Sequence, residues 1–224
     1  MLKKITIYGE RCSGTNYLEE ILLLNFDVEI VWSYGWKHFF GFDDLNDSND
    51  VLFIGIVRNL CDWVNSLYRN PHHLPSELTK DIDTFLNNSF YSINDDNSEK
   101  LNDRNIETYE RYKNIFELRH IKNKFLVEKM PTIVKNYCLI TYDNLIENFV
   151  DVMNKIKDYN LSIKSNINFP LNTYNYKKNV NEVFCKKTNE IQNEVIIEKA
   201  NLFYEKILFP SLFISNDENI YHPS

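Results

Sequence analysis

The sequence predicts an α/β protein in which a mostly parallel sheet is flanked by helices in three layers. Short apolar segments alternate along the chain with amphipathic segments, as strands and helices do in successive βαβ units. Residues 51–57 are almost entirely apolar, which is typical of a central parallel strand covered on both faces. The chain has 224 residues, 43% of them hydrophobic, so we expect a single domain over 1–224 with a sizeable core.

The first unit of this pattern is a strand, a polar loop and a helix. Residues 5–8 favour a strand, residues 9–16 are polar, and residues 17–24 repeat apolar side chains at helical spacing. Backbone N–H groups at the start of such a helix attract an anion, and glycine lets a ligand approach closely. We interpret the loop as a phosphate cradle; the alternative is an ordinary connection between a strand and a helix.

The loop differs from the nucleotide-binding pattern G-x-x-x-x-G-K-[ST]. Gly9 and Gly14 have the spacing of that pattern, but Thr15 stands where its lysine would be. Arg11 is the cation inside the loop instead. A nucleoside triphosphatase built on this loop would lack the lysine that contacts the β- and γ-phosphates.

The remaining elements follow from the same local patterns. Further strands are expected at 27–32, 51–57 and 137–141. Helices are expected after Arg58-Asn59 and at 79–86, 106–120, 142–158 and 190–207, with an irregular segment at 161–187.

Composition excludes several classes of partner. The net charge of −7 and the isoelectric point near 5.3 argue against nucleic acid or an anionic membrane as a partner, so an anionic ligand needs a local basic pocket. The absence of a long apolar run and of a signal peptide predicts a cytoplasmic protein. The four cysteines, Cys12, Cys61, Cys138 and Cys185, are widely spaced, so we expect a reducing compartment and no metal site.

Three polar clusters follow predicted strands. They are residues 11–16, the pair Lys37-His38, and the pair Arg58-Asn59. Because ligands of parallel sheets sit beyond the carboxyl ends of the strands, we expect these clusters to meet at one edge of the sheet. The convergence is a stronger signal than any of the three motifs alone.

Three stretches in order resemble the sulfotransferase family, which uses 3′-phosphoadenosine 5′-phosphosulfate (PAPS). Residues 11–18, Arg-Cys-Ser-Gly-Thr-Asn-Tyr-Leu, resemble its 5′-phosphosulfate loop, although the family's cation directly precedes Ser-Gly-Thr, where this chain has Cys12. Residues 58–66 resemble its 3′-phosphate motif, and 139–145 its later strand and turn. The resemblance implies a P-loop-like sulfotransferase fold, PAPS as co-substrate, and cofactor contacts from Arg11, Cys12, Ser13, Gly14, Thr15, Asn16, Tyr17, Arg58 and Ser66.

The 3′-phosphate motif also has a direct physical interpretation. An arginine at a strand end presents a planar fork to a phosphate, and Ser66 lies two helical turns further on. The alternative is that Arg58 pairs with a carboxylate and Ser66 is a small packing residue.

Lys37 and His38 are the catalytic candidates. Histidine has a suitable pKa for a general base, and a lysine can stabilise a sulfonate or a leaving oxygen. The resemblance implies the same role for His38, since the cytosolic branch of the family carries a histidine about twenty residues before the motif arginine. The alternative is a surface lysine beside a loop histidine. We expect His72, His73, His120 and His222 to be surface residues. Aromatic residues of an acceptor pocket would come from Tyr34, Trp36, Phe39, Phe40 and Trp63, although we expect at least half of these in the core instead.

The sequence therefore predicts transfer of a sulfuryl group to a hydroxyl or amine of a carbohydrate or small molecule. Two alternatives remain: a small-molecule kinase of the P-loop type without its lysine, and a non-catalytic module that binds adenine nucleotides.

Overall fold

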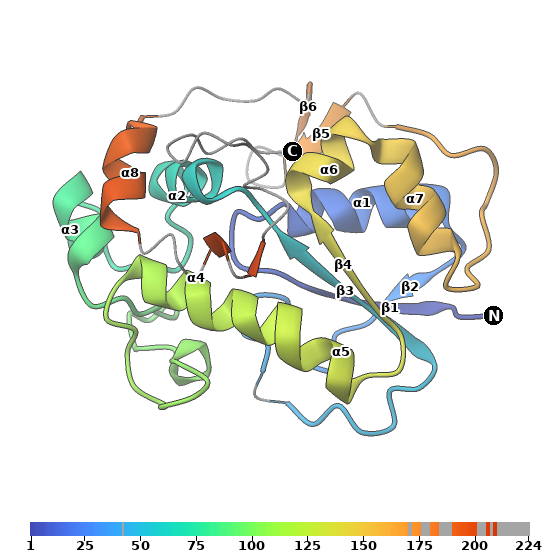
Figure 1. Ribbon diagram of the computed structural model, residues 1–224, viewed down its shortest axis with the longest axis horizontal. Helices are drawn as coiled ribbons and strands as arrows, with labels where there is room; N and C mark the ends of the chain where they lie inside the picture. The colour runs from blue at the N-terminus through green and yellow to red at the C-terminus, as the bar shows by residue number, and fades with distance from the viewer. Residues whose placement is uncertain are drawn as a thin grey trace.

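A four-stranded parallel sheet forms the centre of the molecule in the computed structural model, which describes residues 1–41, 43–169, 172–175, 180–183, 190–200, 205–206 and 208–209. The strand order is β2-β1-β3-β4, and every neighbouring pair is parallel. The strands are β1 (Lys4–Tyr8), β2 (Glu29–Ile30), β3 (Val51–Val57) and β4 (Tyr137–Thr141). The predicted α/β class with a parallel sheet flanked by helices is confirmed (Figure 1).

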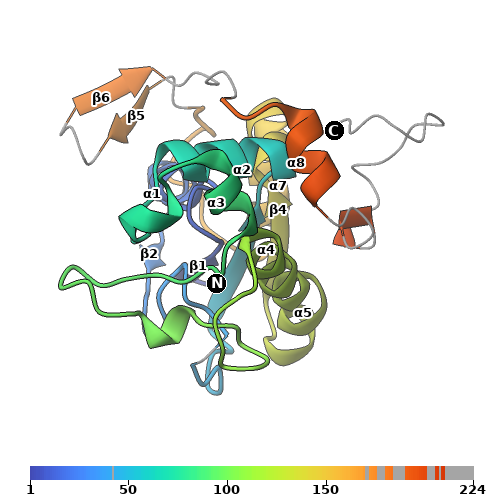
Figure 2. The same ribbon diagram turned by 90° about the vertical axis from the view of Figure 1, so that its left-hand side faces the viewer.

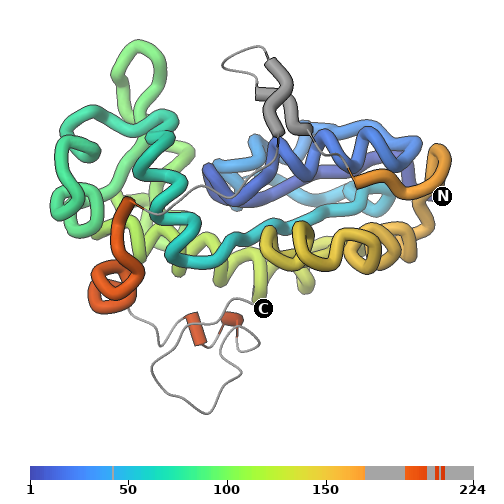
Figure 3. Tube along the Cα trace, turned by 90° about the horizontal axis from the view of Figure 1, so that it is seen from above, coloured from blue at the N-terminus to red at the C-terminus, as the bar shows by residue number. Residues whose placement is uncertain are grey.

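Helices cover both faces of this sheet. Ile5, Ile7 and Ile54 belong to a core formed with α1 (Thr15–Asn25), α6 (Tyr142–Glu147) and α7 (Phe149–Lys157). These three helices run along one side of the sheet, as Figures 1 and 3 show.

On the opposite face, side chains such as Phe53 and Val57 pack against a π-helical turn, Phe125–Lys129, and α5 (Met130–Ile133). Both segments continue α4 (Ile115–Lys124). Residues alternate between the two faces because side chains of a strand point to opposite sides in turn.

A third core lies at one end of the sheet, where α2 (Leu60–Arg69), α3 (Ile82–Asn87), α4 and α8 (Asn193–Lys199) meet. The fully buried Asn65 of α2 holds the segment before α8 in place. Its Nδ2 donates to the carbonyl oxygen of Ile191 at 3.0 Å, and its Oδ1 accepts from the amides of Glu190 and Ile191 at 2.9 and 2.7 Å.

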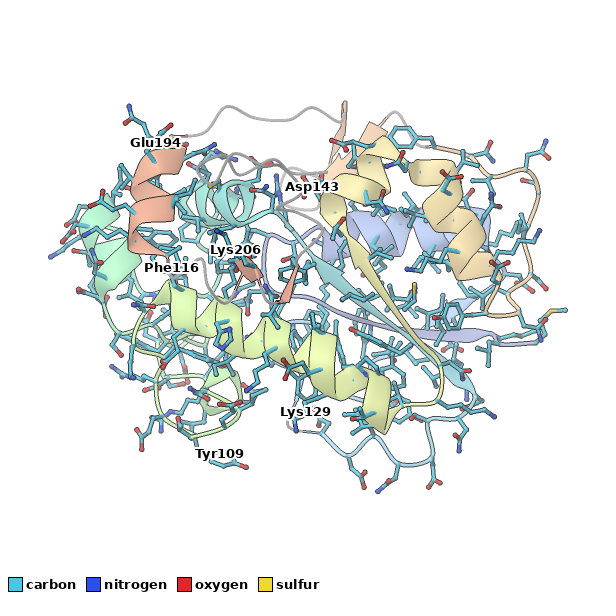
Figure 4. All side chains as sticks on the ribbon, in the orientation of Figure 1. Tyr109, Phe116, Lys129, Asp143, Glu194 and Lys206 are labelled. Atoms are coloured by element: carbon cyan, nitrogen blue, oxygen red, sulfur yellow. The ribbon has the colours of Figure 1, made fainter. Side chains whose placement is uncertain are left out.

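The helix predicted at 106–120 is wrong in its first half. The helix begins at Ile115, because the Asn114 side chain accepts from the amides of Phe116 and Glu117 at 3.0 Å and caps it there. Before that cap the backbone reverses, with Tyr109 at φ +64° and its side chain in solvent at the lower edge of Figure 4.

Other predicted boundaries also move. The 142–158 helix divides into α6 and α7 at Asn148, whose backbone (φ −123°, ψ 43°) is not helical. The helix predicted at 79–86 starts at Ile82, where the Asp81 side chain caps it by accepting from the amide of Thr84 at 2.7 Å. The strand predicted at 27–32 pairs over Glu29–Ile30 alone.

The segment predicted to be irregular, 161–187, contains an antiparallel hairpin of β5 (Asn172–Asn175) and β6 (Val180–Val183). The hairpin stands apart from the parallel sheet (Figure 2). Of the helix predicted at 190–207, α8 is present, and residues 201–204 and 207 lie outside the described residues. Among the helices described, none combines the length and apolar character that a bilayer crossing requires.

Candidate functional site

The three predicted clusters meet at one pocket of about 600 Å³ at the carboxyl ends of the strands. All of the predicted site residues line this pocket except Ser13, whose side chain is buried. The lining residues are Arg11, Cys12, Gly14, Thr15, Asn16, Tyr17, Glu19, Trp32, Trp36, Lys37, His38, Arg58, Ser66, Asn70, His72, His73 and Tyr142.

The loop between β1 and α1 has a conformation that requires its glycines. Gly14 has φ +94°, and a Cβ there would lie 2.3 Å from Cδ2 of Tyr142. A Cβ on Gly9 would lie 2.6 Å from the carbonyl oxygen of Ile56 on β3. Cys12 also has a positive φ, +63°, so the loop turns sharply. Within this turn the amide of Arg11 donates to the Glu10 side chain at 2.7 Å, and the amide of Ser13 donates to the carbonyl oxygen of Glu10 at 3.1 Å.

The first turn of helix α1 lines this pocket without an acidic or capping side chain, and Glu19 lies one turn further along the helix. Thr15 and Asn16, at the start of the helix, both line the pocket. The exposed amides and the positive end of the helix dipole therefore favour an anion at this point.

Arg58 is positioned to add a full positive charge. It directly follows β3, donates from one terminal nitrogen to the carbonyl oxygen of Cys12 at 3.1 Å, and lies 4.7 Å from the ring centre of Tyr142. Its Nε is buried without a hydrogen-bond partner, and it forms no salt bridge within the described part of the chain. The alternative that a carboxylate among these residues neutralises Arg58 is therefore not supported.

The neighbours of Arg58 fix helix α2 beside it. Asn59 caps the helix by accepting from the amide of Cys61 at 3.0 Å, and its own amide donates to Asp143 at 3.1 Å. Figure 4 labels Asp143, which lies at the start of α6. Ser66, two turns along α2, lines the same pocket as Arg58.

Arg11 lines the pocket, but its guanidinium group is occupied by other protein groups. Its side chain is 1% exposed, and its guanidinium bonds to Glu10 at 2.7 Å, Asp103 at 2.9 Å and Ser92 at 2.6 Å. Burial lowers the pKa of Arg11, but the two carboxylates outweigh burial and raise that pKa above its ordinary value. The charge of Arg11 is thus balanced within the protein.

Lys122 completes this buried cluster. Its Nζ donates to Glu10 at 2.5 Å and to Asp103, so two acidic and two basic side chains share one site. Burial raises the pKa of Glu10, but Lys122 and Arg11 lower it well below its usual range. Asp103 and Lys122 were not predicted, because no local pattern links them to Glu10 and Arg11, which lie far away along the chain.

His38 is held by the loop through its ring. Nδ1 lies 2.8 Å from the carbonyl oxygen of Gly9, which can only accept, so Nδ1 carries the hydrogen and Nε2 has the lone pair. The amide of Gly9 donates in turn to the carbonyl oxygen of Lys37 at 2.9 Å. Burial lowers the pKa of His38 to about 3, so its ring is neutral at physiological pH.

Lys37 is a buried pocket residue and not the surface lysine of the alternative interpretation. Its Nζ donates to Asn16 of α1 and lies 3.4 Å from Glu19. It also lies 5.4 and 5.2 Å from the ring centres of Trp32 and Trp36. The ammonium group therefore sits between the start of α1 and two aromatic rings.

The expected surface histidines are found in different settings. His73 is exposed, as expected, and also lines the pocket, whereas His72 is half-buried and its carbonyl oxygen accepts from Arg11 at 3.3 Å. His222 lies outside the described residues. Among the expected acceptor-pocket aromatics, Trp36 lines the pocket, whereas Tyr34, Phe39, Phe40 and Trp63 are not among its lining residues. The indole N–H of Trp63 instead donates to the carbonyl oxygen of Arg11 at 2.8 Å, so Trp63 stabilises the loop between β1 and α1.

The pocket can hold an anion with two separated charges, next to a neutral imidazole. Among the residues described, no group of three or more His, Cys, Asp or Glu side chains is placed to hold a metal ion. Comparison with protein families, with curated protein sequences and with solved structures finds no match to this chain.

Proposed function

We propose that this chain is a sulfotransferase that moves a sulfuryl group from PAPS to a hydroxyl or amine acceptor, a carbohydrate or another small molecule. One observation carries the proposal. The uncapped start of α1 and the guanidinium of Arg58, which lacks a salt bridge in the described residues, line a single pocket with His38 and Lys37. The two positive sites match a nucleotide with phosphate groups at two positions.

In this proposal the two phosphate sites have different ligands. The amides at the start of α1, with Thr15 and Asn16, hold the 5′-phosphosulfate. Arg58 and Ser66 hold the 3′-phosphate, because both line the pocket and can donate to it through the unpartnered Nε and the hydroxyl. Tyr17, which lines the pocket, provides an aromatic surface for adenine.

The transfer step is an in-line displacement at sulfur. The acceptor oxygen or nitrogen forms a bond to sulfur as the bond from sulfur to the 5′-phosphate oxygen breaks, and that oxygen leaves with the electron pair. Nε2 of His38 takes the acceptor's proton. Lys37 stabilises the charge that develops on the leaving oxygen, in the way that positioned cations assist phosphoryl transfer.

His38 can act as a general base only if its low pKa rises when the cofactor binds. A base with a pKa far below the working pH accepts a proton weakly. The bound cofactor brings negative charge next to the ring, and negative charge raises a histidine pKa. The proposal therefore requires the anionic cofactor to strengthen the base that uses it.

A nucleotide comparison tests this function. Adenosine 3′,5′-bisphosphate should raise the melting temperature, since a ligand at one hundred times its Kd stabilises the folded state by about 2.7 kcal/mol. ATP, ADP and AMP, which lack the 3′-phosphate, should raise it less. The proposal would be abandoned if ATP stabilised the protein more than the bisphosphate, because the pocket would then suit a kinase. Transfer of labelled sulfate from PAPS to a panel of sugars, phenols and amines tests the reaction itself.

A further inference from the structure

Lys122 is a buried lysine that the proposed chemistry does not use. It lies in the last turn of α4, and its side chain is 1% exposed. Its Nζ donates to Oε2 of Glu10 at 2.5 Å, to the carbonyl oxygen of His38 at 2.7 Å, and to Asp103. An ammonium group has three hydrogens, so every donor of this lysine has an acceptor.

The acceptors belong to separate parts of the site. Glu10 lies in the loop between β1 and α1, and its Oε1 also accepts from the amide of Arg11 at 2.7 Å. His38 lies in the turn after β2, which is joined to the loop through Gly9. Asp103 belongs to the long segment that connects α3 to α4, residues 88–114. The ammonium group of Lys122 therefore connects the loop between β1 and α1, and the turn that contains His38, to helix α4.

Aromatic side chains of the same turn surround this cation. Nζ of Lys122 lies 5.9 Å from the ring centre of Phe39 and 5.7 Å from that of Phe40, the two residues after His38. Both rings are within the range of favourable cation–π contact. The turn is thus held through its backbone at His38 and through the next two side chains.

We propose that Lys122 is a positioning residue for His38, which fixes the turn of His38 and the loop of Gly9 as one unit so that Nε2 faces the acceptor. This inference rests on the proposed function for its effect on turnover. Its effect on the geometry of His38 does not depend on that function. Lys122 touches neither the pocket's contents nor the reacting atoms, since it is not among the residues that line the pocket.

The test replaces Lys122 by methionine, which keeps most of the length of the side chain and removes the three donors. Because Lys122→Met leaves Glu10 and Asp103 with Arg11 as their only basic partner in the cluster, a second variant, Glu10→Gln with Lys122→Met, restores charge balance. The matched control is Lys124→Met, two residues along the same helix, where the lysine is 37% exposed and lies 3.7 Å from Glu107. All variants are compared as the full chain at temperatures well below their melting temperatures.

The first readout is the tautomer of His38, from ¹⁵N shifts of the imidazole nitrogens assigned with a His38→Asn variant. The wild type and Lys124→Met should show one tautomer with the hydrogen on Nδ1. Both Lys122 variants should show averaged shifts of two tautomers, because the turn no longer holds the ring against Gly9. A lysine that only stabilised the fold would lower the melting temperature and leave the tautomer unchanged, and that result would overturn the proposal.

The second readout is transfer from PAPS. In both Lys122 variants kcat should fall about 10- to 100-fold, as expected when a catalytic group is misplaced. The thermal shift by the bisphosphate should stay close to that of the wild type, because Arg58 and α1 are held by other contacts. An unchanged kcat in the charge-balanced variant would count against the proposal. If the wild type shows no transfer, the proposed function fails, and the tautomer alone decides the role of Lys122.

Discussion

The imidazole Nδ1 of His38 lies 2.8 Å from the carbonyl oxygen of Gly9, so the candidate base is hydrogen-bonded to the first residue of the loop between β1 and α1. The pair joins segments that follow two neighbouring strands, β2 and β1. Any ligand that reshapes the loop would therefore also move the ring.

Arg58→Ala should weaken binding of adenosine 3′,5′-bisphosphate by about 10- to 100-fold. A hydrogen bond to a charged group contributes about 1.5–3 kcal/mol, and each 1.4 kcal/mol is a factor of ten in Kd. Isothermal titration measures the change. Arg58→Lys keeps the charge and loses the planar fork, so its affinity should fall between those of the wild type and the alanine variant.

The control for Arg58 is Arg111→Ala, which removes an arginine that is 43% exposed and pairs with Glu99 at 2.8 Å outside the pocket. Its affinity should equal that of the wild type. Equal affinities for Arg58→Ala and the wild type would remove Arg58 from the phosphate site.

Gly14→Ala should destabilise the fold and abolish most of the ligand shift. A non-glycine residue in the left-handed region costs about 1–3 kcal/mol, and overpacking against Tyr142 adds a similar amount. Urea unfolding measures the loss. Gly41→Ala is the control: Gly41 has φ +105°, but its new Cβ would meet Ile106 at 3.1 Å, away from the pocket. That variant should lose less stability and keep its ligand shift.

The stability of the protein should fall as the pH decreases from about 6.5 towards 3, in part through His38. Burial lowers the folded pKa of His38 to about 3 from the ordinary 6.5, so between these values only the unfolded chain binds a proton at this site. Stability is therefore retained above pH 6.5 and lost below it, with a slope of up to about 1.4 kcal/mol per pH unit.

Urea unfolding across pH 4.5–6.5 should give a shallower slope for His38→Gln than for the wild type. His73→Gln serves as the comparison, because burial also lowers the pKa of His73, and its contribution must be measured separately. Parallel slopes in the wild type and His38→Gln would show that His38 is readily protonated in the folded state.

His38→Asn should lower kcat by about 10²- to 10⁴-fold with little effect on bisphosphate binding. The asparagine amide can still donate to the carbonyl oxygen of Gly9, but it has no lone pair at the position of Nε2. A transfer assay with saturating PAPS measures kcat, and titration with the bisphosphate measures binding. Wild-type turnover in this variant would assign the base to another residue, for which His72 and His73 are the nearest candidates in the pocket.

The local part of the site could be predicted from the sequence, because its residues lie next to strand ends in the chain. Gly14, Arg58 and His38 each follow an apolar segment, and parallel strands bring such positions to one edge. The partners of Arg11 could not be predicted in this way. Ser92 and Asp103 lie 81 and 92 residues further along the chain, and side-chain type alone does not reveal which distant groups will pair.

The helix boundaries failed for a related reason. The apolar spacing in 106–120 continues across Asn114. The side chain of Asn114 nevertheless caps the helix, so the helix begins after Asn114 although the apolar spacing begins before it. The hairpin of β5 and β6 pairs two polar strands away from the main sheet, so it leaves little apolar periodicity to detect.

The hydrogen bonds of Asn65 connect helix α2, which contributes to the pocket, to residues 190–191 late in the chain. Asn65 directly precedes Ser66, which lines the pocket, and it clamps the backbone at Glu190 and Ile191. Occupancy of the pocket and docking of this late segment should therefore favour each other, by the reciprocity that governs linked equilibria. Amide hydrogens at 190–191 should exchange more slowly when a ligand occupies the pocket, and a chain that ended before them should release that ligand sooner.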